Sequence, residues 1–369
     1  MTPAIGTLEV SSLPGKPLTT ADVPFLITVK SNLTILVPAY NEAKSIRDTI
    51  VSLLKQTVQA DEIVVIDDFS SDGTGDIARA MGVTVLRPVR NTGSKAGAQN
   101  YALQFVNTKY TMAIDADTTL APDAVEKLLA ALKDERVAAA CGFVLPRYVH
   151  SVWERGRYIE YLLAFTFYKQ IQEYYEKPLI SSGCFSIYRT SALKFNGGWP
   201  TRTLAEDMDL TWSFYEQRLK VRFVQDAVCY PIEPHNFEFM RKQLKRWSHG
   251  FVQNVLLHWP KLLKFPYLRS IIAVALWDAV VASIAYLLLL PVLAIVFRSP
   301  WFFLGYVIDL PAVLMPILYK SVERRELIRT VLSIPAFFVL RTTNAFFMLE
   351  ALISECIFKK KFCVYEKGH

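Results

Sequence analysis

Short apolar runs that alternate with helix-like stretches over residues 34–114 constrain the fold of this chain most strongly. The predicted strands are residues 34–38, 62–67, 83–86 and 110–114. The predicted helices between them are residues 45–56, 75–81 and 98–105. Strands and helices that alternate at these lengths indicate an α/β fold with a parallel sheet.

Polar side chains gather where these predicted strands end. Tyr40 follows the first strand, Asp67 and Asp68 close the second, and an Asp-Ala-Asp sequence beginning at Asp115 follows the fourth. Open α/β sheets bind nucleotides at the carboxyl ends of their strands. Tyr40 could stack on a uracil ring, and Asp67 or Asp68 could accept hydrogen bonds from the base or the ribose. Simple packing of Tyr40 in the fold is the alternative.

The apolar residues are distributed unevenly, because the chain is 52% hydrophobic but concentrates its long apolar runs in the last hundred or so residues. Residues 271–297 hold a single charge, at Asp278, and form the strongest candidate for a membrane span. Residues 301–319 are a shorter candidate. Residues 331–358 are long enough to span a membrane. They could form either one spanning helix or a re-entrant pair, because they contain Pro335, Arg341, Asn344 and Glu350. We predict two or three membrane segments.

The chain carries a formal net charge of +7, and its basic residues cluster beside the apolar runs, in residues 241–269, 320–329 and 359–361. This placement favours an anionic membrane surface over nucleic acid as a partner, and no nucleic-acid-binding pattern is seen. Residues 241–259 have a helical stripe of apolar residues with a basic flank, which suits an interface helix or an ordinary core helix. The positive-inside rule predicts a multi-pass protein of the cell membrane with a cytoplasmic N-terminal domain.

Neither end of the chain nor its cysteines suggest secretion. Residues 1–31 contain four prolines and lack the apolar core of a signal peptide, so we expect an irregular tail there. The five cysteines are scattered without a Cys-x-x-Cys pair. Reduced thiols facing a cytosol are therefore expected.

The acidic pair Asp115 and Asp117 is a candidate metal site. Hard carboxylate oxygens at this spacing suit Mg²⁺ or Mn²⁺ bridging a diphosphate, which stabilises the charge of a leaving group. Lys95 lies in a glycine-rich loop and is a natural charge partner for the same diphosphate. An acidic turn and a solvated lysine are the ordinary structural interpretations of these residues.

A second acidic cluster, Glu206, Asp207 and Asp209, precedes a helix face made by Gln243, Arg246 and Trp247. These last three are spaced i, i+3, i+4 and so share one face. A carboxylate near an incoming hydroxyl can take its proton, and crowded carboxylates can raise the pKa of one of them toward that task. Asp207 is the candidate general base; a helix N-cap at Asp207 or Asp209 is the alternative. Two carboxylate sites and a cationic aromatic face suit sugar transfer.

The order of these motifs resembles that of the family 2 glycosyltransferases, whose nucleotide-sugar-binding domain has the GT-A fold. The motifs are Pro38–Glu42, Asp67–Thr74, Gly93–Asn100 and Asp115–Asp117. Ser182-Gly183, Glu206-Asp207 and Gln243-x-x-Arg246-Trp247 are similar to those of membrane polysaccharide synthases, namely the cellulose, hyaluronan, chitin and poly-N-acetylglucosamine synthases. The resemblance covers roughly residues 33–260. In one departure, Ala205 stands where the family usually has threonine, which removes a local hydrogen bond.

The resemblance implies an inverting transfer from a UDP-sugar, with Mg²⁺ or Mn²⁺ held by Asp115 and Asp117 and with Asp207 as the base. It implies a nucleotide-sugar site formed by Ala39, Tyr40, Glu42, Asp67, Asp68, Lys95, Asp115, Gln243, Arg246 and Trp247. It implies an acceptor site formed by Ser182, Gly183, Glu206 and Trp247. The dinucleotide-binding pattern at Gly73 and Gly75 is disfavoured, because four surrounding aspartates would repel a pyrophosphate.

The predicted organisation is an irregular tail (1–31), a GT-A domain (32–237), amphipathic interface helices (238–269), a membrane region (270–358) and a basic tail (359–369). Processive polysaccharide synthesis is the leading functional hypothesis. Because the membrane region is small, a secretion channel would be thin and could require a homo-oligomer. Single-sugar transfer to a lipid-linked acceptor, such as a polyprenyl phosphate or a glycolipid, is the first alternative. An inactive nucleotide-sugar sensor or membrane scaffold is the second.

Overall fold

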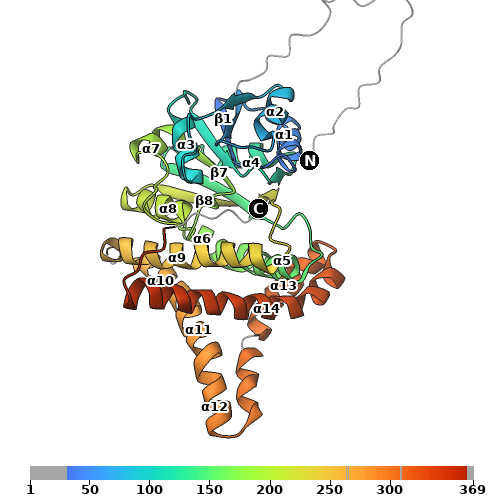
Figure 1. Ribbon diagram of the computed structural model, residues 1–369, viewed down its shortest axis with the longest axis vertical. Helices are drawn as coiled ribbons and strands as arrows, with labels where there is room; N and C mark the ends of the chain where they lie inside the picture. The colour runs from blue at the N-terminus through green and yellow to red at the C-terminus, as the bar shows by residue number, and fades with distance from the viewer. Residues whose placement is uncertain (1–30, 263, 265, 308–309, 364–369) are drawn as a thin grey trace, which may run out of the picture. The chain divides into compact units, whose positions relative to one another are not determined.

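A mixed sheet of eight strands organises the part of the chain that the computed structural model describes, residues 31–262, 264, 266–307 and 310–363. The strand order is β3-β2-β1-β4-β7-β6-β8-β5 (Figure 1). The strands are β1 (Leu33–Ala39), β2 (Glu62–Asp67), β3 (Thr84–Leu86), β4 (Tyr110–Ile114), β5 (Thr119–Leu120), β6 (Val137–Val144), β7 (Phe185–Arg189) and β8 (Lys220–Tyr230). Almost all of the predicted tail at residues 1–31, and the end of the basic tail, lie outside the described residues.

The four strands predicted from the sequence are present and parallel. β1 pairs with β2 and β4, and β2 pairs with β3, all in the parallel direction. The sheet as a whole is mixed rather than parallel, because β7 runs antiparallel to both β4 and β6, and β5 runs antiparallel to β8. The chain between β6 and β7 does not return over the sheet as a βαβ crossover but builds a separate helical segment, which allows β7 to enter in the opposite direction.

Helices cover both faces of the sheet, as the continuous apolar sequence of β1 requires. Leu33, Ile35 and Val37 point into one core, which includes α1, α2 and α4. Leu36 points into the other, which includes α3, α7 and α8. These helices are α1 (Ile46–Leu54), α2 (Thr74–Ala80), α3 (Lys95–Leu103), α4 (Ala124–Ala131), α7 (Thr190–Phe195) and α8 (Glu206–Glu216).

Three further helices pack against one another side by side next to the α8 and β8 side of the sheet (Figure 1). They are α5 (Val152–Leu163), α9 (Phe237–Leu262) and α14 (Leu327–Leu352). Met240 and Leu244 of α9 are fully buried against Leu340 and Phe347 of α14. This part of the apolar stripe of α9 therefore contacts protein, as in a core helix.

Two helical stretches among the described residues are long and apolar enough to cross a membrane. Ile272–Val296 has a mean hydropathy of 2.7 with only 12% of its window buried, whereas Leu327–Ile357 has a mean hydropathy of 1.4 with 33% buried. Residues 301–319 do not form one helix, because a 3₁₀ segment η4 (Pro300–Val307) precedes α13 (Leu310–Glu323). The first stretch comprises α10 (Pro266–Leu276), η2 (Trp277–Val281), α11 (Ala282–Ile284), η3 (Ala285–Leu289) and α12 (Leu290–Val296).

The first apolar stretch descends away from the sheet, and the chain returns beside it through η4 and α13 (Figure 1). Tyr286 and Tyr306 stack with ring centroids 5.1 Å apart, and the Tyr306 hydroxyl donates a hydrogen bond to the Tyr286 carbonyl. Gly305 lies against Leu290, where an added Cβ would come within 2.7 Å of a leucine methyl group. This pair of segments thus forms a helical hairpin.

Candidate active site

A cavity of about 930 Å³ opens at the carboxyl ends of β1 and β4 and continues between α8, α9 and α5. All but one of the residues that the sequence predicts for the site line this cavity. Those residues are Ala39, Tyr40, Glu42, Asp68, Lys95, Asp115, Asp117, Ser182, Gly183, Glu206, Asp207, Gln243, Arg246 and Trp247. The fold therefore brings together side chains that are separated by up to two hundred residues in sequence.

Asp67 is the exception, and its neighbour Asp68 lines the cavity instead. The fully buried Asp67 carboxylate accepts a hydrogen bond from the Ser70 amide at 2.9 Å and pairs with Arg87. The Asp68 carboxylate is fixed by the amide and hydroxyl of Thr92, at 2.8 and 2.9 Å. Successive residues at a strand end point in different directions, so only one of the two reaches the cavity.

Lys95 connects the acidic pair to the loop before β7. Its ammonium pairs with the Asp115 carboxylate and donates a hydrogen bond to the Gly183 carbonyl at 2.9 Å. Lys95 is the first residue of α3, and the Ser94 side chain caps this helix by accepting a hydrogen bond from the Gly97 amide at 3.1 Å. A cation is thus held beside the candidate metal carboxylates at the start of α3.

The donor set at Asp115 and Asp117 fits a divalent cation that shares its coordination with a phosphate ligand. Both carboxylates line the cavity. No group of three or more His, Cys, Asp or Glu side chains in the described ranges is arranged to hold a metal by itself. Mg²⁺ is commonly bound by one or two carboxylates together with substrate phosphates.

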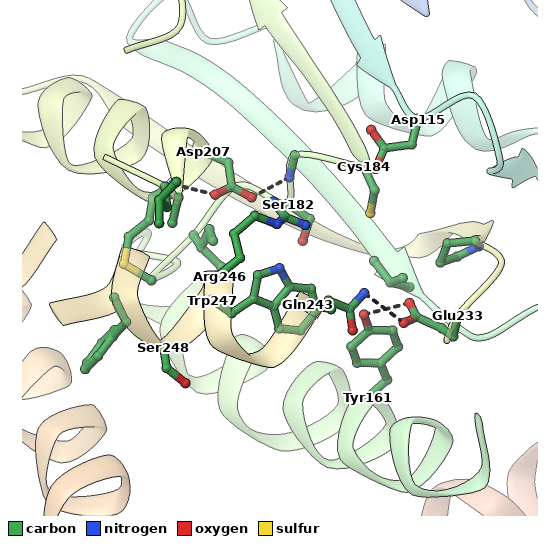
Figure 2. A pocket seen from close by; sticks show the side chains of 18 of the residues that line it. Asp115, Tyr161, Ser182, Cys184, Asp207, Glu233, Gln243, Arg246, Trp247 and Ser248 are labelled. Atoms are coloured by element: carbon green, nitrogen blue, oxygen red, sulfur yellow. Dashed lines mark hydrogen bonds between the residues drawn. The ribbon is translucent and has the colours of Figure 1, made fainter. Parts of the chain in front are cut away.

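Asp207 is held at the start of α8 by two backbone amides (Figure 2). Its carboxylate accepts hydrogen bonds from Gly183 and from Met208, both at 2.8 Å. The N-cap residue of α8 is Ala205, whose side chain makes no capping hydrogen bond, so neither Asp207 nor Asp209 occupies the N-cap position. Gly183 is required, because a Cβ at this position would lie 2.9 Å from the Asp207 carboxylate.

The other two acids of the cluster have different environments. Glu206 lines the cavity and is buried. Burial raises its pKa, the charge of Asp207 raises it further, and Lys95 and Arg246 partly oppose the shift. Asp209 does not line the cavity, so sequence proximity alone does not place it with the catalytic candidates.

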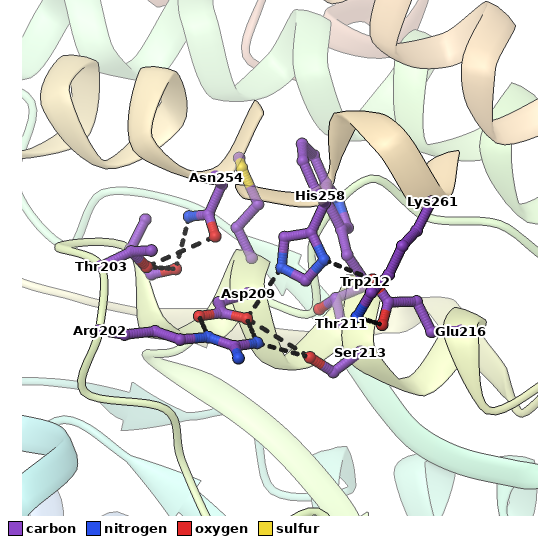
Figure 3. A network of polar contacts seen from close by, with 12 residues as sticks. Arg202, Thr203, Asp209, Thr211, Trp212, Ser213, Glu216, Asn254, His258 and Lys261 are labelled. Carbon is purple, nitrogen blue, oxygen red and sulfur yellow. Dashed lines mark hydrogen bonds and ion pairs between the residues drawn. The ribbon is translucent and has the colours of Figure 1, made fainter. Parts of the chain in front are cut away.

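Asp209 belongs to a polar network that joins α8 to α9 (Figure 3). Arg202 donates two hydrogen bonds to its carboxylate, at 2.8 and 2.7 Å. The imidazole of His258 lies between two carboxylates, with Nε2 2.9 Å from Asp209 and Nδ1 2.7 Å from Glu216. Burial raises the pKa of Asp209, but the hydrogen bonds from Arg202 and His258 outweigh it, so the net pKa is lowered.

Gln243, Arg246 and Trp247 of α9 all line the cavity, with Arg246 pointing toward Ser182 and Gln243 pointing toward Glu233 and Tyr161 (Figure 2). A buried arginine, Arg157 of α5, orders this face. Arg157 donates a hydrogen bond to the Gln243 side-chain oxygen at 2.6 Å. Its guanidinium carbon lies 4.6 Å from the Trp247 ring centroid, which is a cation–π distance.

Residues 34–196 match the family described as Glycosyl transferase family 2. This part of the chain is therefore similar to the family 2 glycosyltransferases. Among curated relatives, it is 27% identical over 222 residues to a poly-beta-1,6-N-acetyl-D-glucosamine synthase of Staphylococcus aureus (strain COL), covering 59% of this chain and 54% of the relative. It is 28% identical over 237 residues to the synthase of the same name from Staphylococcus epidermidis, covering 62% and 57%. The chain spans about half the length of these relatives.

A solved structure with a similar fold is the mannosyltransferase PcManGT from Pyrobaculum calidifontis, in complex with GDP-Man and Mn²⁺. The TM-score is 0.59 at 19% sequence identity, and the match covers 88% of this chain and 86% of that one. At this identity the similarity concerns the fold. It confirms the predicted GT-A-like α/β domain followed by C-terminal helices.

Several residues of the cavity belong to no motif that predicts a site role. Glu233, in the loop after β8, is buried and accepts a hydrogen bond from the Tyr161 hydroxyl at 2.8 Å. The Gln243 amide donates to the same carboxylate at 3.4 Å. Burial raises the pKa of Glu233, against the opposing effect of Arg157. Its position after a strand end is the one sequence signal that could have identified it.

Lys169 is a second cavity residue that belongs to no predicted motif, and it directly follows a π-helical turn. The helical segment that starts with α5 is interrupted by η1 (Ala164–Tyr168) before α6 (Lys169–Tyr174) begins. The buried Lys169 ammonium donates a hydrogen bond to the Ser182 hydroxyl at 2.9 Å, and the residue lines the cavity. Single π-helical turns inside α-helices often occur at functional sites.

Proposed function

We propose that this protein transfers a sugar from a UDP-sugar to an acceptor hydroxyl with inversion at the anomeric carbon, and that Asp207 is the general base. The observation that carries the proposal is the shared cavity, which contains Asp207, the pair Asp115 and Asp117, and the cations Lys95 and Arg246. Such a reaction needs a carboxylate near the nucleophile and positive charge near the leaving group.

The base role of Asp207 is supported by how the carboxylate is held. The amides of Gly183 and Met208 fix its orientation, so little motion is required before it accepts the proton of an acceptor hydroxyl. Glu206, beside it, is buried, and its pKa is raised by that burial and by the charge of Asp207. Trp247 of the opposing helix offers a ring for an acceptor sugar.

The leaving diphosphate would be bound by residues on the β1 and β4 side of the cavity. Lys95 and Arg246 supply positive charge. A Mg²⁺ or Mn²⁺ ion held by Asp115 and Asp117 would stabilise the departing charge. Tyr40 and Asp68 are proposed for the nucleotide base and ribose. Nucleotide release from a panel of UDP- and GDP-sugars, measured with and without Mg²⁺, Mn²⁺ or a chelator, tests donor and metal together.

Replacing Asp207 by asparagine tests the central assignment. We expect D207N to lose at least about a hundredfold in transfer rate, the usual contribution of a general base, while UDP binding is retained. Asp76→Asn is the matched control, because the Asp76 side chain is 84% exposed and lies outside the cavity. Unchanged turnover in D207N would contradict the proposal. Absence of turnover in the native protein with every donor would instead favour the inactive sensor or scaffold.

The acceptor has two candidates. Processive elongation of a polysaccharide follows from the similarity to poly-beta-1,6-N-acetyl-D-glucosamine synthases. Transfer of a single sugar to a lipid-linked acceptor is the alternative, and the lining of the cavity by membrane-helix residues favours it. Sizing the product formed from radiolabelled donor separates them, because a product that never exceeds one added sugar excludes elongation.

We further propose that the protein is bound to the cell membrane with its catalytic domain in the cytoplasm. The two apolar stretches and the membrane polysaccharide synthase relatives support this placement. The proposed division is a GT-A domain over 32–237, interface helices over 238–269 and a membrane region over 270–358, flanked by tails at 1–31 and 359–369. Assembly into a homo-oligomer is proposed for the processive case only.

A further inference from the structure

We propose that the acceptor is an amphiphile whose sugar hydroxyl faces Asp207, whose phosphate is bound by Arg341 and whose apolar chain lies between the membrane helices. This inference rests on the proposed function, because the acceptor would enter the same cavity as the donor. It assigns a ligand site to residues of η3 and α14, which no motif identifies.

The cavity that contains Asp207 continues into the helical region. Its far end, here called the membrane-side part, is lined by Ala279, Tyr286, Val313, Phe337, Leu340 and Met348. Ala279 and Tyr286 belong to one apolar stretch, and Phe337, Leu340 and Met348 belong to the other. A ligand in this cavity can therefore contact the catalytic carboxylate and both candidate membrane helices at once.

The chemistry of these walls selects an apolar chain. Alkyl and aromatic side chains cannot satisfy the hydroxyl groups of a sugar, and burying an unsatisfied hydroxyl is unfavourable. A hydrocarbon chain instead gains free energy with each CH₂ group that it buries. A glycan without a lipid would thus match the half of the cavity near Asp207 and Trp247 but not the membrane-side part.

A charged side chain lines the cavity together with these apolar residues. Arg341 is in the middle of α14, within a stretch otherwise suited to a membrane, and it lines the cavity. Its guanidinium carbon lies 4.8 Å from the Tyr286 ring centroid. Ionisable residues inside apolar helices are costly and commonly mark ligand sites. A guanidinium can bind a phosphate through two parallel hydrogen bonds.

Polar neighbours hold this part of α14 against the catalytic domain. Asn344, one turn after Arg341 and also lining the cavity, donates a hydrogen bond to the Glu160 carboxylate at 2.9 Å. Glu160 in turn pairs with Arg157, which orders Gln243 and Trp247. The head group would therefore lie beside the helix face that orients the acceptor sugar.

The volume limits how much of the ligand enters. A cavity of about 930 Å³ is within the range of small-molecule sites and must also accommodate the donor. Only the head group and the first segment of a chain would fit. The remaining chain would stay in the bilayer, which agrees with the exposed apolar surface of Ile272–Val296.

The test uses the full chain in phosphatidylcholine nanodiscs that contain polyprenyl phosphate, polyprenol or dioleoyl phosphatidic acid. Retained lipid is measured by mass spectrometry, and UDP binding is measured separately as a report of folding. We expect R341Q to weaken polyprenyl phosphate binding about tenfold or more, the loss expected for a charge-assisted hydrogen bond, with UDP binding unchanged. Arg329→Gln is the matched control, because Arg329 is an exposed arginine of the same helix outside the cavity.

A second variant, Ala279→Trp, fills the membrane-side part and should also reduce lipid binding without affecting UDP. If polyprenyl phosphate is retained more strongly than phosphatidic acid, the bound chain is an isoprenoid. If phosphatidic acid is retained more strongly, the bound chain is an acyl chain.

Native-like lipid binding by both R341Q and A279W, or equal retention of polyprenol and its phosphate, would overturn the inference. Transfer to a soluble oligosaccharide by the native protein, together with no specific retention of polyprenyl phosphate, would reject the lipid site but leave the proposed function standing. Specific lipid binding without any donor turnover would reject the proposed function alone.

Discussion

The geometry around Asp207 depends on a residue that has no side chain. Gly183 approaches the carboxylate closely enough to donate its amide hydrogen at 2.8 Å, and a Cβ there would lie 2.9 Å from a carboxylate oxygen. Ala205, the N-cap of α8, cannot donate or accept through its side chain, so the Met208 amide bonds to Asp207 instead. Small changes at these positions should therefore act on catalysis before they act on the fold.

Gly183→Ala should lower kcat by about tenfold or more, because the added methyl group displaces the Asp207 carboxylate and a small misplacement of a catalytic group is costly. Steady-state kinetics and UDP binding check this prediction. The control is a double-mutant cycle with D207N. If Gly183 acts by positioning Asp207, the alanine substitution should have little further effect in the D207N background; full additivity would contradict the mechanism.

Glu206 should make stability depend on pH in a defined direction. Its pKa in the folded protein lies above the usual value of 4.5, so the folded state retains a proton that the unfolded state releases. The native protein should therefore lose stability relative to E206Q as the pH rises through 4.5 and above. Thermal unfolding of both proteins between about pH 4 and 7 measures this. Glu238→Gln, at a side chain that is 77% exposed, should follow the native protein.

The helices α8 and α9 together provide the residues proposed to bind the acceptor. The site therefore depends on the relative position of these two helices. α8 begins with Glu206 and Asp207, while α9 presents Gln243 and Trp247. His258, near the end of α9, joins them by bridging Asp209 and Glu216 of α8. The network in Figure 3 thus links elements rather than forming a second site.

His258→Ala should lower the free energy of unfolding by about 2 kcal/mol, because it leaves the buried Asp209 carboxylate without one of its hydrogen-bond partners. Thermal or denaturant unfolding in a fixed detergent measures the change. Lys261→Ala removes another partner of Glu216, but this lysine is 62% exposed, and its loss should cost at most about 1 kcal/mol. Equal effects of the two substitutions would show that the network does not stabilise the contact between α8 and α9.

At the scale of the whole molecule, the distribution of exposed apolar side chains separates a polar catalytic part from a membrane-facing part. Leu288 and Val292 are 50% and 53% exposed in the first apolar stretch, and neighbouring apolar side chains there are also exposed. Large exposed apolar surfaces of this kind mark contact with a membrane or another protein. The exposed apolar side chains of the hairpin of α10 to α13 thus support the proposed membrane contact there.

Leu288→Lys combined with Val292→Lys should reduce the fraction of protein that remains with membranes after carbonate washing. Each lysine costs about 3 kcal/mol at the centre of a spanning helix. Phe195→Lys is the control, since Phe195 of α7 is 82% exposed but belongs to the catalytic part. A membrane-bound fraction that is unchanged by the double lysine variant would reject the hairpin as the membrane contact.

Sequence reasoning located the strand ends well, because strand boundaries and their polar neighbours are local features. It could not find the cluster of Arg157, Tyr161 and Glu233. Arg157 and its partner Gln243 are 86 residues apart, and Tyr161 and Glu233 are 72 apart. Such pairs form only when separate helices pack, and neither composition nor periodicity encodes which helices meet. The sequence did not predict that β7 runs antiparallel to its neighbours, for the same reason.

The sequence by itself determined the alternation of strands and helices, the carboxylates at the strand ends and the apolar stretches, because each follows from the period of neighbouring side chains. Only the tertiary structure decided that Asp68 rather than Asp67 faces the cavity, that Asp209 belongs to a bridging network, and that the cavity extends to Arg341. These outcomes depend on how layers distant in sequence pack together. Packing fixes the direction of each side chain, whereas local pattern fixes only the element to which it belongs.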